Sequence, residues 1–306
     1  MRMKNNSLRF RIGDIALIVM MILPLVVAMT IKILTTPASE GINVTGAMVY
    51  FTLPMPIQSM PITEAQVNSL LVMISIAALC LYLTHGIRAG VETKRQMLAE
   101  WIVEKVSGLV RENMGEGFIG FSAFIASILI LSALSSLMSL LGVYAPTSDL
   151  NVVAGWAILV FALITYYKLK GGLGYYLKGF LEPVPFLLPF NIIGEFATPV
   201  SMAFRHYGNV LSGSVIAVLL SYALAALSSF VLGWMPGFIA EIPLFRVGIP
   251  AVLSLYFDIF SGCMQAYIFA MLTMLNVSGG FSQEAYEKRQ QKKLARRQAK
   301  EKIINN

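Results

Sequence analysis

The chain has 306 residues, of which 57% are hydrophobic and 13% are charged, and its formal net charge is +7. Soluble globular domains carry about 25% charged residues, so this composition excludes a soluble protein. The apolar runs are continuous and do not alternate in segments of about ten residues, which excludes a transmembrane β-barrel. We therefore predict an all-α polytopic membrane protein with about six membrane segments.

Six apolar runs reach the length of a membrane helix, which is about 20 residues. We place them near residues 14–34, 66–87, 118–142, 151–168, 186–232 and 244–278. The first run follows a basic stretch, as the core of a signal peptide does. Its apolar region is longer than a typical signal core and Lys32 follows it, so we predict an uncleaved anchor.

Lysine and arginine are distributed asymmetrically over the predicted loops. With the N-terminus inside, the basic residues of the N-terminal stretch, of residues 88–111 and 168–178, and of the C-terminal tail all lie on the cytoplasmic side. The outer loops 36–62, 143–150 and 233–243 contain no lysine or arginine. This pattern follows the positive-inside rule, so both termini are predicted to be cytoplasmic. We expect loop 36–62 to be ordinary solvated chain.

Residues 91–112 differ from the rest of the chain, because apolar and charged residues alternate there at helical spacing. This pattern predicts an amphipathic helix on the inner membrane surface. The same pattern also fits a helix that packs on a soluble partner, and it does not distinguish this arrangement from one on the membrane surface. After the next helix, Asp149 lies in the hairpin turn of 118–168, where it either caps the following helix or helps water to enter.

The last two segments are too long to cross a bilayer at right angles. The 47 residues from 186 to 232 would extend roughly 70 Å as a helix, against a hydrocarbon core of about 30 Å. Prolines up to Pro199 break or bend the start of this segment, so the helix proper is expected to begin near Ile192. We predict that both segments are long and steeply tilted.

Arg205 lies deep within the 186–232 segment. An arginine at the centre of a membrane helix costs about 2.5–3.5 kcal/mol, and its pKa above about 12 prevents escape by deprotonation. It therefore indicates an ion pathway, or else it snorkels to an interface several turns away. Ser201, Gly208 and Ser212 share its helical face, and such small neighbours suit close approach by another helix.

The final segment carries polar residues at helical spacing: Ser254, Asp258, Gly262, Gln265 and Asn276. Asp258 is a second costly intramembrane charge, which either exchanges protons or forms an ion pair with Arg205. Gln265 has both a donor and acceptors. It belongs to the same pathway or makes a hydrogen bond between packed helices.

Glu195 lies ten residues before Arg205, about 15 Å nearer the cytoplasm in a helix. It either hydrates an inner aqueous cleft or sits at the interface near a helix N-terminus, where an acid is favourable. We expect His206 to be a structural hydrogen-bonding residue. Cys80 and Cys263 lie in apolar runs and are interpreted as small hydrophobic residues, with no disulfide, metal or cofactor predicted.

The tail after Glu284 is dense in lysine and arginine, which favours attraction to anionic lipid and not nucleic-acid binding.

Four segments together resemble one family. Residues 191–199, 204–209 and 265–273 look like subunit a of F-type ATP synthases, and residues 146–151 resemble the hairpin turn of that family. The resemblance extends over about residues 64–280. It divides the chain into an extra N-terminal anchor and outer loop (1–63), a proton-channel domain (64–280) and a basic cytoplasmic tail (281–306).

The resemblance implies a non-catalytic stator subunit in the membrane sector of a rotary ATP synthase, in the bacterial plasma membrane. Its partners would be a c-ring of small helical-hairpin subunits, the peripheral-stalk b subunits, the rest of the ATP synthase complex and the lipid bilayer. Two offset aqueous half-channels would carry protons to and from the ring carboxylates.

The resemblance also assigns roles along the pathway. Arg205 matches the essential arginine that faces the ring, Gln265 matches the glutamine facing this arginine, and Asn209 completes the Arg-x-x-Gly-Asn core. Asp258 and Ser214 fall where members carry acids or histidine, and they would line the outer half-channel.

Asp149 would lie near the mouth of that outer half-channel, and Glu195 matches a carboxylate assigned to the inner one. Some positions depart from the family pattern: His206 replaces leucine, Gly194 replaces a common glutamate, and Thr198 replaces a common lysine.

Two other classes compete with this interpretation. A secondary transporter would use Arg205 to bind an anionic substrate, but such folds usually contain internal repeats and no self-similar halves are found here. A structural scaffold would recruit partners through residues 91–112 and would tolerate the loss of Arg205.

Overall fold

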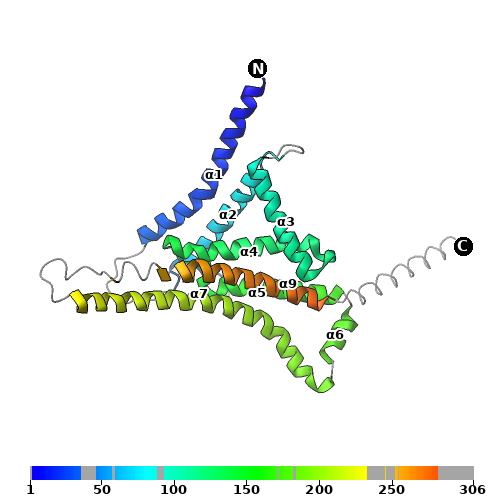
Figure 1. Ribbon diagram of the computed structural model, residues 1–306. Coiled ribbons are helices and arrows are strands. Elements are labelled where there is room, and N and C mark those ends of the chain that lie inside the picture. Colours follow the sequence, from blue (N-terminus) through cyan, green and yellow to red (C-terminus); the bar gives the residue numbers. More distant parts are fainter. Residues whose placement is uncertain are drawn as a thin grey trace.

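The structure is a computed structural model that describes residues 2–35, 46–56, 59–87, 93–170, 172–181, 184–232, 245, 252–253 and 255–281. Helices make up nearly all of this part of the chain (Figure 1). Six segments in it are long and apolar enough to cross a membrane: Gly13–Thr35, Glu64–Thr84, Glu116–Leu141, Leu150–Lys170, Pro185–Leu232 and Leu255–Gly280. The predicted all-α polytopic membrane fold is confirmed. The stretch of the final segment from 246 to 251 lies outside the described residues.

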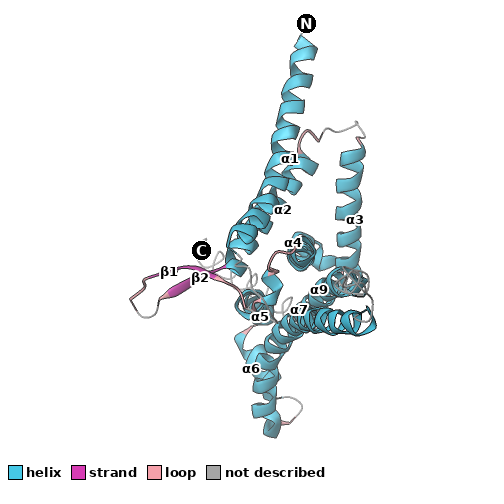
Figure 2. Cartoon of the chain, turned by 90° about the vertical axis from the view of Figure 1, so that its left-hand side faces the viewer, coloured by secondary structure: helices cyan, strands magenta, loops and turns pink. Residues whose placement is uncertain are grey.

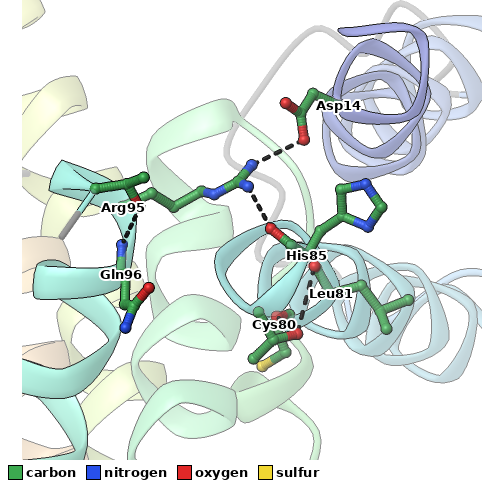
Figure 3. A network of polar contacts seen from close by, with 8 residues as sticks. Asp14, Cys80, Leu81, His85, Arg95 and Gln96 are labelled. Carbon is green, nitrogen blue, oxygen red and sulfur yellow. Dashed lines mark hydrogen bonds and ion pairs between the residues drawn. The ribbon is translucent and has the colours of Figure 1, made fainter. Parts of the chain in front are cut away.

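The first membrane helix, α1 (Arg2–Thr35), lies beside α2 (Glu64–Thr84) in both overall views (Figures 1 and 2). An ion pair joins each end of the apolar part of α1, Gly13–Thr35, to the rest of the chain. Near the cytoplasmic end predicted for α1, one terminal guanidinium nitrogen of Arg95 lies 2.8 Å from Asp14, and the other donates to the carbonyl of His85 (Figure 3). At the opposite end, the ammonium of Lys32 lies 3.1 Å from the Glu64 carboxylate.

A short hairpin connects these two helices, where a solvated loop was expected. Strands β1 (Val49–Leu53) and β2 (Met60–Thr63) pair antiparallel, with Leu53 opposite Met60. The strands form because valine, tyrosine, phenylalanine, isoleucine and threonine all favour extended backbone. The expectation for this loop missed the hairpin, and residues 36–45 lie outside the described residues.

Helix α3 (Lys94–Met114) is the predicted amphipathic helix. Its N-cap is Thr93, whose hydroxyl accepts a hydrogen bond from the Gln96 amide at 3.2 Å. It runs steeply across the direction of α4 (Figure 1), and it buries Val110 and Met114 in the core of the bundle. Its first turns expose large apolar side chains: Met97, Leu98, Trp101 and Val103. Its position on the membrane surface stays a prediction.

Four helices form the packed centre of the protein. They are α4 (Ser122–Leu137, preceded by the 3₁₀ turn Glu116–Phe121), α5 (Leu150–Lys170), α7 (Leu188–Leu232) and α9 (Gly262–Gly280). Their largest core cluster includes Ile125, Val160, Met202, Phe269 and Met274.

Short 3₁₀ segments, Met138–Leu141 and Pro146–Ser148, form the turn from α4 to α5. Helix α6 (Leu173–Leu181) and the 3₁₀ turn Pro185–Leu187 lead into α7.

Small residues let these helices approach closely. A Cβ atom added to Gly262 would lie 2.9 Å from the Cβ of Ser136 on α4. Ser132, Ser135 and Ser136 are all buried on this face of α4. Small side chains at such contacts are typical of membrane helices, which associate through close packing.

Helix α7 starts at Leu188, a full turn earlier than the expected start near Ile192. The second residue of this helix is Pro189, whose missing amide hydrogen would be unpaired in the first turn in any case. Pro199 lies inside the helix, which curves along its length (Figure 1). Its 45 residues extend about 67 Å, so it must tilt or bend within a membrane.

The last segment begins with a π-helix, η6 (Leu255–Ser261), before continuing as α9. Asp258 lies in the π-helical part and Gln265 in the α-helical part. The predicted polar stripe assumed an α-helical period throughout, and a π-helix has a wider repeat. The α-helical spacing therefore does not carry through this segment, and Ser254 lies outside the described residues.

Candidate functional site

Arg205 lies on an open face of α7. Its side chain is exposed in the isolated chain, and it makes no ion pair or hydrogen bond with any residue that the structure describes. The apolar side chains of Val200 and Phe204 beside it are 53% and 56% exposed. Ser201 and Ser212, on the predicted arginine face, are exposed as well. A permanent cation thus lies on a largely apolar helix surface that the other described residues do not cover.

The alternative of an ion pair between Arg205 and Asp258 is not found in the structure. The Asp258 carboxylate instead accepts a hydrogen bond of 2.9 Å from the hydroxyl of Ser139, which follows α4. Asp258 is half-buried. Sequence reasoning missed Ser139, whose only signal was a serine close to the hairpin turn.

A cavity of about 500 Å³, the outer cavity of the predicted topology, lies on the C-terminal side of Arg205 along α7. Asp258 and Ser214 both line it, which brings together the two residues predicted for an outer half-channel. Further polar groups in its wall come from α1, from the turn between α4 and α5, and from α7 itself: Lys32, Ser139, Tyr144, Ser148 and Tyr207. Among the described lining residues the charged ones are Lys32 and Asp258.

Asp149 caps α5, since its carboxylate accepts a 2.9 Å hydrogen bond from the Asn151 amide. The structure therefore supports the capping alternative, and Asp149 does not line the outer cavity. Burial raises the pKa of the nearby Tyr144 phenol, and the negative charge of Asp149 raises it further. Tyr144 stays neutral at physiological pH, and its hydroxyl donates to the Ser148 carbonyl at 3.0 Å.

Two further cavities, of about 390 and 190 Å³, are the inner cavities of the predicted topology and lie on the N-terminal side of Arg205 along α7. Both are lined by Glu195 of α7 and Lys168 at the end of α5. The Lys168 ammonium lies 2.6 Å from one oxygen of Glu195. The other oxygen is buried without a hydrogen-bond partner among the described residues. Glu195 therefore lines a cavity, as one of its two interpretations required, and Lys168 is a partner that sequence reasoning missed.

Gln265 is 4% exposed and lies in α9, which packs against α7. Its amide makes no hydrogen bond with a described residue, so a helix-packing hydrogen bond is not found there. Asn209 connects α7 to the last segment, because its side-chain oxygen accepts from the Ser261 hydroxyl at 2.9 Å. This contact fixes the register of the two helices just beyond Arg205.

His206 is fully buried on the opposite side of α7 from the open face. Its Nε2 lies 3.4 Å from the Ser132 hydroxyl, and its ring packs edge-on against Trp156 and Phe269. These contacts agree with the structural role expected from the sequence.

The residues of the site occupy three levels along α7. Glu195 lines the inner cavities, Ser214 lines the outer cavity, and Arg205 lies between them. In helical rise, Arg205 is about 15 Å from Glu195 and about 14 Å from Ser214. Cavities with charged and polar side chains in their walls, on both sides of a cation in a membrane helix, are typical of an ion-translocating membrane protein.

Comparison with known proteins identifies the family. The family described as "ATP synthase A chain" matches residues 66–278. ATP synthase subunit a of Bacillus subtilis is 32% identical over 225 residues, which cover 70% of this chain and 88% of the relative. Subunit a of Alkalihalophilus pseudofirmus is 33% identical over 193 residues, which cover 59% and 76%.

A third relative, from Propionigenium modestum, is described as an ATP synthase subunit a that is sodium ion specific. It is 36% identical over 143 residues, which cover 46% of this chain and 42% of the relative.

The chain belongs to the ATP synthase A chain family. It is an integral, ion-translocating component of the membrane sector of an ATP synthase, in a bacterial plasma membrane. Residues 1–65, with α1 and the hairpin, lie outside the region that matches the family.

Proposed function

We propose that this chain is the stator subunit that passes protons to and from a rotating c-ring through two offset half-channels. The outer half-channel would be the cavity with Asp258 and Ser214, with Asp149 near its mouth. The inner one would be the paired cavities at Glu195. The observation that carries the proposal is the position of Arg205, exposed on α7 between these two sets of cavities.

The mechanism is electrostatic. A protonated ring carboxylate is neutral and can face lipid, whereas an ionised one cannot. Close to Arg205 the ionised form is favoured, because an opposite charge within about 4–6 Å lowers a carboxylate pKa by about 1–3 units. The carboxylate therefore releases its proton into one half-channel before it passes Arg205 and takes up another afterwards.

Arg205 also separates the two half-channels. Its fixed positive charge repels a cation that would move directly from the outer cavity to the inner ones. The proton must then travel with the ring, and each charge that crosses delivers about 2.3 kcal/mol per 100 mV of membrane potential. Asn209 would hold α7 and the last segment in register through Ser261, and Gln265 would belong to the same pathway.

The partners and topology follow from the same proposal. The open apolar face of α7 around Arg205 is where the c-ring would pack, and the peripheral-stalk b subunits would hold the chain in place. Both termini would be cytoplasmic. Residues 1–63 would be an additional anchor and outer loop, 64–280 the proton-channel domain, and 281–306 a basic tail.

Replacement of Arg205 by alanine in the intact complex tests the proposal. We expect proton-driven ATP synthesis in membrane vesicles to fall to background while the complex still assembles. The matched control is Arg111→Ala, which removes an arginine with a 57% exposed side chain from α3 and should leave synthesis unchanged.

Retained proton-driven synthesis by Arg205→Ala complexes would refute the proposal. Uptake of an anionic substrate by the purified chain in liposomes, lost in the same variant, would instead support a secondary transporter.

A further inference from the structure

The additional helix α1 forms part of the outer cavity. Lys32, near the end of α1, lines this cavity together with Asp258 and Ser214. Lys32 precedes the region that matches the family, so the family comparison assigns it no role. A lysine in an apolar membrane helix is costly unless it is paired or functional.

Glu64 holds Lys32 in place. The Lys32 ammonium lies 3.1 and 3.2 Å from the two oxygens of the Glu64 carboxylate. The Glu64 side chain is 1% exposed, whereas that of Lys32 is 27% exposed, and Glu64 does not line the cavity. The pair is therefore oriented, with its positive end towards the cavity and its negative end buried behind it.

The surrounding packing keeps this orientation rigid. Ala28, one turn before Lys32, is buried against Val72 of α2 and against Met138 and Val143 of the turn from α4 to α5. Val143 is itself a lining residue of the cavity. The wall formed by α1 is thus continuous with the wall formed by the region that matches the family.

We propose that Lys32 presents a fixed positive charge in the outer half-channel, held there by Glu64. The inference rests on the proposed function for the identity of this cavity as a half-channel. The charge lowers the local concentration of cations such as hydrated Na⁺ in the cavity. The same repulsion acts on a proton that enters the cavity. Lys32 therefore sets the electrostatic potential of the pathway.

The electrostatic potential in the cavity can be measured with charged thiol reagents. A reporter cysteine is placed in the cavity by Ser214→Cys, in a chain whose own cysteines are removed by Cys80→Ala and Cys263→Ala. Intact complexes in membrane vesicles are treated with a cationic or an anionic methanethiosulfonate. The ratio of the two labelling rates of this chain reports the potential at the thiol, because shared effects on thiol reactivity cancel.

We expect Lys32→Gln to raise the ratio of cationic to anionic labelling about fourfold. A unit charge on the order of 10 Å away in water changes the local concentration of each reagent about twofold, in opposite directions. Lys32→Arg keeps the charge and should leave the ratio unchanged. The control Asp14→Asn breaks the ion pair at the other end of the apolar part of α1 and should also leave the ratio unchanged.

The exchange Lys32→Glu with Glu64→Lys keeps an ion pair between the helices but reverses the charge at position 32. It should raise the ratio further, and it serves as the test if Lys32→Gln complexes fail to assemble. An unchanged ratio in either variant, or an equal rise in Asp14→Asn, would overturn the inference. This measurement needs no transport, so its failure is distinct from that of the Arg205→Ala test.

Discussion

The ammonium of Lys168 lies 2.6 Å from the carboxylate of Glu195, which ties the end of α5 to the first third of α7. Both side chains are mostly buried, at 25% and 12% exposure, and both line the inner cavities. The pair leaves the second Glu195 oxygen without a partner among the described residues. That oxygen is the one left without a counter-charge, and in the proposed inner half-channel it would take the proton.

Removal of Lys168 should destabilise the chain. Lys168→Gln leaves the Glu195 carboxylate buried without its cation, and loss of one partner of a buried pair costs about 3–5 kcal/mol. Partial exposure reduces this to about 1–3 kcal/mol. The measurement is the temperature at which half of the chain dissociates from the purified complex, which we expect to fall.

An exposed ion pair in the same chain provides the control. Arg111 and Glu116 are 57% and 71% exposed, so Arg111→Gln should change stability by less than about 1 kcal/mol. The double variant Lys168→Met with Glu195→Met should recover most of the lost stability, because apolar residues often replace a buried pair at little cost. Equal losses in the single and double variants would contradict this account of the pair.

Asp258→Asn should slow proton uptake from the outer side more than it lowers stability. Asparagine can still accept the Ser139 hydrogen bond through its carbonyl oxygen, but it cannot exchange a proton. We expect proton-driven ATP synthesis to fall at least about tenfold, since a positioned proton-transfer group contributes about 10²–10⁴-fold. The assembled amount of complex should stay the same.

Ser139→Ala should have a milder effect, about threefold on synthesis, because it leaves the Asp258 carboxylate present but without its charge-assisted hydrogen bond. Ser127→Ala is the matched control, because Ser127 lies in α4, the helix just before Ser139 in the chain. Among the described residues its hydroxyl bonds only to the Ala123 carbonyl of the same helix. A normal rate in Asp258→Asn would remove Asp258 from the pathway.

Gly262→Ala should loosen the contact between α9 and α4. The added Cβ would lie 2.9 Å from the Cβ of Ser136, so one helix must move. Overpacking of this kind costs about 1–3 kcal/mol. Gly279→Ala in the same helix meets nothing within 4 Å and should be neutral, and Ser136→Gly should restore the stability of Gly262→Ala. Thermal dissociation of the complex measures all three.

His206→Ala should reduce stability without changing the pH dependence of ATP synthesis. The variant leaves a cavity between Trp156 and Phe269 and removes the contact with Ser132, at a cost of about 2–3 kcal/mol. The measurement is synthesis per assembled complex over a range of pH. A shifted pH profile at normal assembly would place His206 in the proton pathway.

Most of the fold was predictable because apolar length and proline positions are local properties of the chain. The six membrane segments and the amphipathic helix follow from them directly. The start of α7 was missed because the first turn of a helix tolerates proline without losing a hydrogen bond. The predicted polar stripe through Asp258 and Gln265 assumed an α-helix. The spacing of polar residues does not reveal the π-helix at Leu255–Ser261.

By itself, the sequence determined that a cation sits inside a membrane helix, since the cost of burying Arg205 depends only on its chemistry and its apolar neighbours. The sequence also determined the family, because short motifs specify it. Only the tertiary structure decided which side chains share a cavity: Lys32 with Asp258, and Lys168 with Glu195. These partners are 226 and 27 positions apart in the chain, and the packing of separate helices, which no local pattern encodes, brings them together.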